Sequence, residues 1–283
     1  MKSLTDTFIL NNGVKIPCVG FGTWQTPDGE TAVKAVLKAL DTGYRHIDTA
    51  AIYGNEKGIG DALKQCGIPR EEIFITSKLW NAERGYEKTL AAFEVTMEKL
   101  GLDVLDLYLI HWPAAKGDPA EWQKTNLETW RAFELLYEQK RIRAIGVSNF
   151  LPHHLEPVLR EAKVKPMVNQ IEFHPGYTQP EAVEFSRANG IVVEAWSPLG
   201  TGKMLGNPDL LRIAGKYGVS VARLCIRWCL QNGTLPLPKS VTPERIEENA
   251  KVFDFAIDAE DMTFIDAMPY IGGSGSHPDK ISF

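Results

Sequence analysis

The sequence contains few cysteines and no framework of paired ones. Its 283 residues include Cys18, Cys66, Cys225 and Cys229, too few and too scattered to build a disulfide-stabilised fold. Cys225 and Cys229 are spaced to share one face of a helix. Because no histidine or carboxylate stands at ligand spacing from them, we expect reduced core thiols and no metal site.

Long hydrophobic runs and an excess of positive charge are also absent. No apolar run reaches the roughly eighteen residues of a membrane-spanning helix, and residues 1–10 contain none of signal-peptide length. The formal net charge is −5 and the pI about 5.8, which argues against non-specific binding to nucleic acid or acidic membranes. We therefore expect a cytoplasmic protein that binds neither nucleic acid nor a membrane.

A complete glycine fingerprint for dinucleotide binding is missing as well. The stretch Gly20-Phe21-Gly22-Thr23-Trp24-Gln25 begins like Gly-x-Gly-x-x-Gly but has Gln25 where the third glycine belongs. This weakens the prediction of a doubly wound open sheet, which remains the alternative fold.

What is present is an alternation of short apolar runs with segments of helical period. In the first helical segment, Val33, Val36, Leu37 and Leu40 follow i, i+3, i+4, i+7, so one stripe should face inward. The predicted strands are Val19–Gly22, His46–Asp48, Phe74–Lys78, Leu105–His111, Ile142–Ser148, Met167–Glu172, Val192–Trp196 and Thr234–Pro236.

These eight units predict an α/β protein with a parallel sheet covered on its outer face. Without a linker or a break in composition, they favour a closed (β/α)₈ TIM barrel, which typically takes about 250 residues. We predict one barrel domain over residues 1–283. Thr7–Leu10 and Val14–Pro17 flank Asn12-Gly13 and should form a hairpin with a primed turn, closing the bottom of the barrel. A short tail should end the chain.

The carboxyl ends of barrel strands converge on one mouth. Asp48 ends one predicted strand, Tyr53 follows in a tight loop whose Asn55 should cap the next helix, and Lys78 and His111 end two further strands. Singly, each has a simpler explanation, such as a helix cap, a surface lysine or a core histidine. Their occurrence at the same edge favours a shared chemical role.

Such a set is suited to protonating an oxygen. Tyrosine is a weak acid near neutrality because its reference pKa is about 10. A neighbouring ammonium lowers that pKa, a carboxylate holds the ammonium in place, and a neutral imidazole orients a carbonyl oxygen. The hydride for a reduction has to come from elsewhere, since none of these side chains can supply one.

These residues stand in blocks that resemble the aldo-keto reductases along nearly the whole chain. The blocks are GFGTW (20–24), GYRHIDTAAIYGN (43–55), ITSKLW (75–80), DLYLIHWP (106–113), IGVSNF (145–150), NQIEFHP (169–175), AWSPLG (195–200) and PKS (238–240). The sequence is most similar to the prokaryotic and protozoal branch with glyoxal/methylglyoxal reductases, 2,5-diketogluconate reductases and prostaglandin F synthases.

The resemblance implies that Tyr53 is the general acid, tuned by Lys78 and Asp48, and that His111 positions the substrate. It implies NADPH as cofactor, and Trp196 stands where relatives usually carry Tyr or Phe for stacking. The implied cofactor residues are Gly22, Thr23, Asp48, Ser148, Asn149, Gln170, Trp196, Ser197, Pro198, Leu199, Lys239, Ser240, Val241, Thr242, Arg245, Glu248 and Asn249. The implied substrate residues are Trp24, Tyr53, Trp80, His111 and Trp112.

Our hypothesis is a monomeric, NADPH-dependent reductase of small aldehydes and ketones, including 2-oxoaldehydes such as methylglyoxal. The alternative functions are an NADPH-binding redox sensor with little turnover and a Schiff-base enzyme using Lys78. For Arg245 and Glu248, the alternative to cofactor binding is a plain exposed pair on one helix.

Three further segments have expectations of their own. The loop Ala114–Thr125 looks short, which suggests an open pocket, and Gly272–Ser276 is either disordered or a lid over the site. His153, His154 and His174 lack carboxylate or thiol partners at ligand spacing, so we expect them at helix starts and in loop packing rather than on a metal.

Overall fold

Eight parallel strands form a barrel in the computed structural model, which describes residues 1–113 and 118–281. Each strand pairs with the next along the chain. The strands are β3 (Phe21–Gly22), β4 (His46–Asp48), β5 (Phe74–Leu79), β6 (Leu105–Ile110), β7 (Ile142–Ser148), β8 (Val168–Glu172), β9 (Val192–Trp196) and β10 (Leu235–Leu237).

Backbone hydrogen bonds join the last strand to the first. The amides of Gly20 and Gly22 donate to the carbonyls of Pro236 and Pro238, each at 3.0 Å, so the sheet closes on itself. The predicted TIM barrel is confirmed. A doubly wound sheet is excluded, because its strand order would have to reverse at a switch point.

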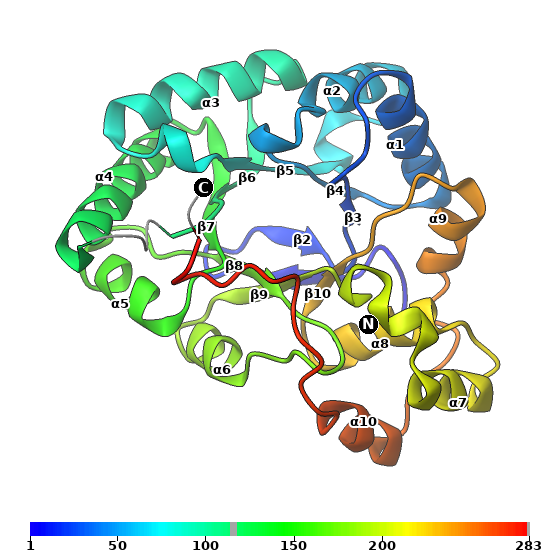
Figure 1. Cartoon of the computed structure of the whole chain (residues 1–283). Helices are drawn as coiled ribbons and strands as arrows, with labels where there is room; N and C mark the ends of the chain where they lie inside the picture. The colour runs from blue at the N-terminus through cyan, green and yellow to red at the C-terminus, as the bar shows by residue number, and fades with distance from the viewer. Residues whose placement is uncertain (114–117, 282–283) are drawn as a thin grey trace.

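Helices surround the barrel (Figure 1). They are α1 (Glu30–Thr42), α2 (Glu56–Gln65), α3 (Tyr86–Leu100), α4 (Pro119–Glu138), α5 (Pro152–Glu161), α6 (Pro180–Ala188), α7 (Pro208–Lys216), α8 (Val221–Gln231), α9 (Pro243–Ala250) and α10 (Ala259–Asp266), with 3-10 turns η1 (Ala51–Tyr53), η2 (Arg70–Glu72), η3 (Asn81–Glu83) and η4 (Gly200–Gly206). The inward stripe of α1 buries Val36 and Leu40, and Cys225 and Cys229 are free thiols buried on α8. Within the described residues, no helix is long and apolar enough to cross a membrane.

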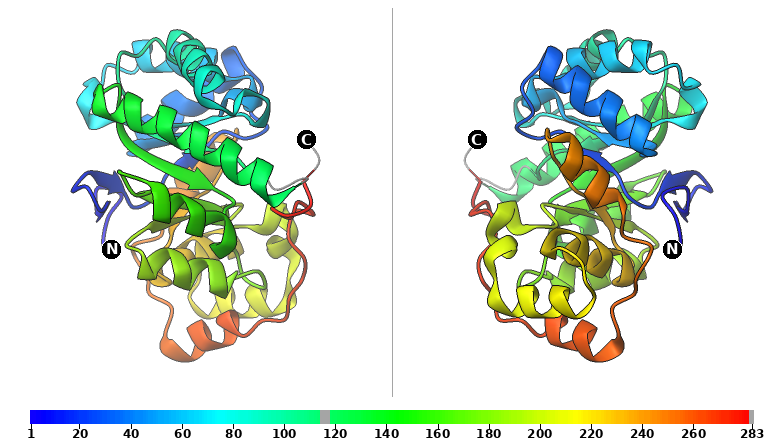
Figure 2. Two further views of the ribbon diagram at one scale, coloured as in Figure 1. Left: turned by 90° about the vertical axis from the view of Figure 1, so that its left-hand side faces the viewer. Right: turned by 90° about the vertical axis from the view of Figure 1, so that its right-hand side faces the viewer.

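The predicted N-terminal hairpin consists of β1 (Thr7–Ile9) and β2 (Lys15–Pro17). Its turn differs from the prediction, because only Gly13 has a positive φ (86°) and its amide donates to Leu10 O at 2.8 Å. A loop one residue longer than a primed turn removes the need for a second left-handed residue. The Asn11 amide donates to Pro166 O, just before β8. Figure 2 shows the hairpin at the opposite end of the barrel from the C-terminal tail.

Asp106 ties three neighbouring strands together from a fully covered position. Its side chain is 1% exposed and accepts hydrogen bonds from Arg70 (2.6 Å), the Ile75 amide on β5 (2.9 Å) and Arg143 on β7 (2.6 Å). A carboxylate loses its hydration on burial, so these three donors are what makes the position tolerable.

Replacing Asp106 by alanine should therefore lower the free energy of unfolding by about 2–4 kcal/mol, since a buried amide and two guanidinium groups lose their acceptor. Urea denaturation measures this change. Glu94→Ala is the matched control, because Glu94 pairs bidentately with Arg141 but is 58% exposed; it should cost less than about 1 kcal/mol. An equal loss of unfolding free energy in the two variants would show that Asp106 contributes no more to stability than an exposed ion pair does.

Candidate active site

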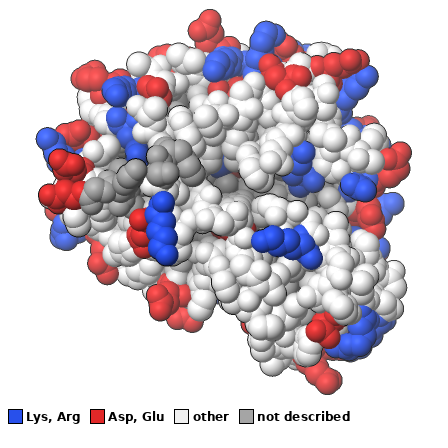
Figure 3. Space-filling view, viewed as in Figure 1, with Lys and Arg blue, Asp and Glu red and all other residues white. Residues whose placement is uncertain are grey.

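A cavity of about 1080 Å³ opens at the carboxyl ends of the barrel strands. The face that contains it is hollowed near its centre, where the surface is mostly uncharged, and charged side chains lie mainly around its rim (Figure 3). All the site residues predicted from the sequence line this cavity except Lys78, Val241 and Thr242.

Lys78 lies behind the cavity wall and has no exposed surface. Its ammonium donates to Asp48 Oδ1 at 2.6 Å, to Thr49 O at 2.9 Å and to Tyr53 Oη at 3.4 Å. It also lies 4.9 Å from the centre of the Tyr53 ring. The predicted group of acid, ammonium and phenol is therefore assembled, with the phenol on the cavity side.

The balance of charges keeps Lys78 protonated. Burial opposes the charged form, but the contacts with Asp48 and Tyr53 together outweigh it, so the pKa of Lys78 is raised above its usual value of 10.5. A protonated amine without exposed surface is a poor nucleophile, so the Schiff-base alternative loses its basis.

The pKa of Tyr53 shifts in the opposite direction from the one expected. Burial raises it, and although Lys78 pulls it down, the pKa remains above its usual value of 10. How deeply the phenol is covered depends on packing between distant segments, and this burial is the largest effect on the pKa of Tyr53.

His111 is a neutral imidazole beside the phenol. Its ring lies edge-on to Tyr53 and to Trp80, with ring centres 5.7 and 5.4 Å away. Burial, and then the charge of Lys78, hold the pKa of His111 well below 6.5. The expected neutral state thus follows from the structure.

Polar side chains from the next strands form a connected group. The Ser148 hydroxyl donates to Gln170 O (2.8 Å), the Asn149 amide donates to His111 O (3.0 Å), and the Trp196 indole donates to Asn149 Oδ1 (2.8 Å). These bonds fix the Trp196 ring in the cavity wall. The predicted amide cluster and aromatic residue are therefore side by side.

The backbone of the cavity wall is strained at several points. Asn149 (φ 64°) and Ser197 (φ 50°) follow β7 and β9 directly, and Gln25 (φ 59°) and Thr201 (φ 52°) also line the cavity. Left-handed backbone at residues other than glycine is held in place by its surroundings and is concentrated at functional sites.

Asn55 has a different role from the helix cap that we expected. It precedes α2, but its side chain makes no capping bond. Its amide donates to the carbonyls of Thr23 (2.9 Å) and Thr26 (3.0 Å), and its oxygen accepts from Thr49 (2.8 Å). Asn55 therefore fastens the loop after β3 to the loop that carries Tyr53.

The cavity is also lined by a group of cationic and polar residues. They are Lys239, Ser240, Arg245, Glu248 and Asn249, and the Lys239 ammonium donates to Gln25 O at 3.3 Å. Among the described residues no ion pair joins Arg245 to Glu248. The structure therefore does not support the alternative that these two residues only pair with each other on the helix. Val241 is 43% exposed outside the cavity, and Thr242 precedes α9.

The C-terminal tail lies over the mouth. Ser274 and Ser276 line the cavity, the Ser274 amide donates to Glu172 Oε2 at 3.0 Å, and Lys203 donates to Gly273 O at 2.9 Å. This favours the lid over disorder. On the other loop, α4 begins already at Pro119 and residues 114–117 lie outside the described residues.

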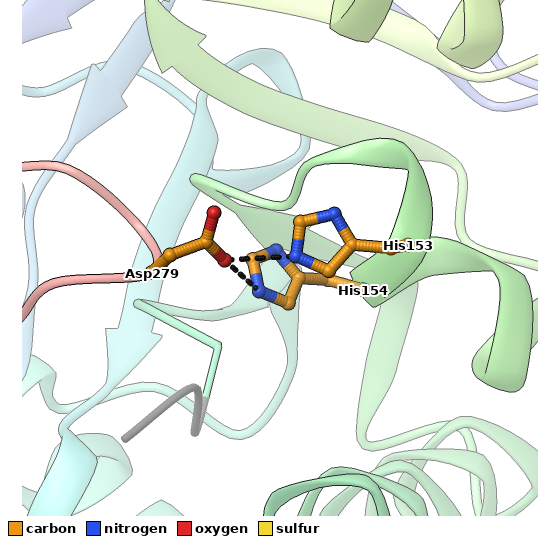
Figure 4. Close-up of side chains that lie close together, drawn as sticks. All are labelled: His153, His154 and Asp279. Carbon is orange, nitrogen blue, oxygen red and sulfur yellow. Dashed lines mark hydrogen bonds and ion pairs between the residues drawn. The ribbon is translucent and has the colours of Figure 1, made fainter. Parts of the chain in front are cut away.

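The histidines have carboxylate neighbours that the sequence did not indicate. Asp279 Oδ1 lies 2.8 Å from His153 Nε2 and 3.0 Å from His154 Nε2 (Figure 4). His154 Nδ1 accepts from the Leu151 amide, which leaves the neutral ring's proton on Nε2, facing Asp279. That tautomer suits a hydrogen bond to the tail and opposes metal ligation through Nε2. His174 also has a carboxylate neighbour, Glu172, at 3.5 Å.

Several residues of the site were not predicted. Glu194, in the middle of β9, is fully buried and bonds to Gln170. A charged residue inside an apolar strand was the available signal. The sequence offered no signal for the apolar wall before and along α7 and α8, formed by Leu205, Leu211, Ala214, Val219, Val221 and Ala222. Ser274 and Ser276 belong to the glycine-rich tail, for which a lid was one of the two expectations.

The structure is a TIM barrel with a group of titratable side chains at its mouth. The sequence model of the Aldo/keto reductase family matches residues 18–269. The chain therefore belongs to the aldo/keto reductase family and is an oxidoreductase.

Individual relatives cover nearly the whole chain. It is 50% identical to a glyoxal reductase of Bacillus subtilis (strain 168), over 99% of both chains. It is 47% identical to a 9,11-endoperoxide prostaglandin H2 reductase of Trypanosoma cruzi (strain CL Brener), over 96% of this chain and 94% of the relative. A solved structure of a Gox0644 variant in complex with NADPH has a TM-score of 0.89 and 41% identity, over 98% of each chain. The expected branch of the family is confirmed.

The buried neutral histidines should make stability depend on pH. Burial, and then Lys78, lower the pKa of His46 on β4 to about 3, while an unfolded histidine titrates near 6.5. Below pH 6.5 the unfolded chain binds a proton that the folded chain refuses, so stability is complete above this pH and falls as the pH drops toward 3.

His46→Gln removes this titration, while its amide can still bond to Thr76, the partner of His46 Nε2 at 2.9 Å. From near neutrality down to about pH 4.5, the wild type should lose about 2 kcal/mol more unfolding free energy than the variant, as measured by urea denaturation. If the unfolding free energies of the wild type and the variant fell equally over this pH range, His46 would be protonated in the folded chain and the prediction would be wrong.

Proposed function

We propose that this chain is an NADPH-dependent reductase that converts small aldehydes and ketones, including 2-oxoaldehydes such as methylglyoxal, to alcohols. One observation carries the proposal. The phenol of Tyr53, backed by Lys78 and Asp48, lines the same cavity as the cations Lys239 and Arg245. The similarity to a glyoxal reductase and to a Gox0644 variant that binds NADPH supports it.

The donor set in the cavity fits NADPH. Lys239, Ser240 and Arg245 supply two positive charges and a hydroxyl for the 2′-phosphate. Trp196 would stack on the nicotinamide while Ser148, Asn149 and Gln170 hold its carboxamide. Ser197, Pro198 and Leu199 would follow the pyrophosphate, and Gly22, Thr23, Glu248 and Asn249 would complete the contacts. Val241 and Thr242 are left with no contact to the cavity.

The cofactor supplies the hydride, and the side chains supply the proton and the positioning. Tyr53 donates its phenolic proton to the carbonyl oxygen of the substrate. Lys78 stabilises the phenolate that remains, and Asp48 keeps Lys78 charged and in place. Neutral His111 orients the carbonyl oxygen toward the phenol, and Trp24, Trp80 and Trp112 wall the space beside it.

Tyr53→Phe should remove the proton donor without removing a cofactor contact. We expect kcat to fall by about 10²–10⁴-fold, the usual contribution of a general acid, while the Kd for NADPH changes little. The measurements are loss of NADPH absorbance with methylglyoxal or a nitrobenzaldehyde, and quenching of tryptophan fluorescence. Full activity of the variant would refute the assignment. Tight NADPH binding without turnover by the wild type would favour the redox-sensor alternative.

Arg245→Ala should reduce the preference for NADPH over NADH by about tenfold or more, because a charge-assisted hydrogen bond contributes roughly 1.5–3 kcal/mol. NADH binding should hardly change, since that cofactor lacks the 2′-phosphate. The control is Arg160→Ala, whose side chain is 66% exposed and pairs with its neighbour Glu161. An unchanged ratio of the two Kd values in Arg245→Ala would show that the phosphate is bound elsewhere.

A further inference from the structure

The amide of Gln170 is held in one orientation by two acidic side chains. Its nitrogen Nε2 donates to Asp48 Oδ2 at 2.8 Å and to Glu194 Oε2 at 2.7 Å. A primary amide nitrogen carries two hydrogens, so both are used. The oxygen Oε1 accepts no hydrogen bond within the described parts of the chain, and Gln170 lines the cavity. Its side chain therefore offers the cavity a hydrogen-bond acceptor.

The reverse orientation of this amide is unfavourable. It would place Oε1 against the carboxylate of Asp48, the ion-pair partner of Lys78, and leave Asp48 Oδ2 without this donor, in a region that is almost fully buried. Two hydrogen bonds from one nitrogen also fix the plane of the amide. A single bond to Asp48 would leave the amide free to turn about that bond.

Glu194 makes no other contact that explains its place in the barrel. It is fully buried on β9, and its second oxygen, Oε1, has no hydrogen-bond partner among the described residues. The nearest basic group is His46 Nε2 at 3.9 Å, which already bonds to Thr76. Burial, and then the charge of Asp48, raise the pKa of Glu194 to about 8, so near neutrality it is mainly a carboxylic acid. It does not line the cavity and so acts only through Gln170.

We propose that Glu194 is a positioning residue that turns the Gln170 carbonyl oxygen toward the cavity, where it selects a ligand carrying a primary amide. The inference rests on the proposed function, in which that amide is the carboxamide of the nicotinamide ring. Gln170 then accepts one N–H of the carboxamide. Its bond to Asp48 also joins this binding contact to the Lys78–Tyr53 group.

The test compares NADPH with its 3-acetylpyridine analogue, in which a methyl group replaces the amide NH₂. The analogue keeps the carbonyl but cannot donate to Gln170. Wild type should bind NADPH about fivefold to tenfold more tightly than the analogue, as expected for one hydrogen bond to a buried acceptor. Quenching of tryptophan fluorescence gives both Kd values without turnover.

Two variants of Glu194 separate its hydrogen bond from its volume. Glu194→Met keeps the size but lacks the acceptor, so the Kd ratio should fall to within about twofold of one as the Gln170 amide loses its fixed plane. Glu194→Gln can present its own carbonyl oxygen to Gln170 and should keep the wild-type ratio. If the methionine variant does not fold, Glu194→Thr replaces it, since its short hydroxyl cannot reach Gln170.

The matched control is Glu56→Met. Glu56 is also a buried acidic side chain, 1% exposed, but it accepts from Ser77 at 2.7 Å, away from Gln170. Its variant should keep the wild-type ratio. The positioning role would be overturned if the folded Glu194→Met or Glu194→Thr variant kept the wild-type ratio of the two Kd values. It would also be overturned if this ratio fell equally in the Glu56→Met variant. Failure of the wild type to bind NADPH at all would instead refute the proposed function.

Discussion

The site depends on one buried ion pair, between Lys78 and Asp48. The two side chains are 2.6 Å apart, and their relative exposures are 0% and 5%. Burying two charges costs free energy that their attraction returns only if the remaining polar atoms are also satisfied. Thr49 O, Tyr53 and Gln170 supply those contacts, so the mouth of the barrel is arranged around the pair.

Three buried titratable side chains near this pair are mainly uncharged. Burial raises the pKa of Glu194 to about 8 and lowers that of His46 to about 3, so near neutral pH both are mainly uncharged. His111 is neutral for the same reason. Asp48 and Lys78 therefore face a low-polarity surrounding in which the field of the ammonium is little screened. This is the condition under which Lys78 has most effect on the phenol of Tyr53.

Much of the fold followed from the sequence, because apolar runs and helical periods report directly which residues must be buried. The four residues Asp48, Tyr53, Lys78 and His111 were found because strand ends converge, an arrangement fixed by the barrel itself. Contacts between distant segments left no such pattern. Asp279 reaches His153 across 126 positions, and Glu194 stands in mid-strand, where its partner depends on strand register. Burial of Tyr53 likewise depended on packing that no local pattern records.

That burial bears on how the phenol can act. Since the pKa of Tyr53 lies above its usual value despite Lys78, Tyr53 holds its proton at neutral pH until a strong base forms next to it. A carbonyl oxygen is a very weak base, but it becomes a strong one as a hydride reaches the carbon. In the proposed reaction, proton release would therefore be tied to hydride arrival. In that reaction Lys78 would have its largest effect after the transfer, when the phenolate is present, and so would stabilise the charge that the reaction creates.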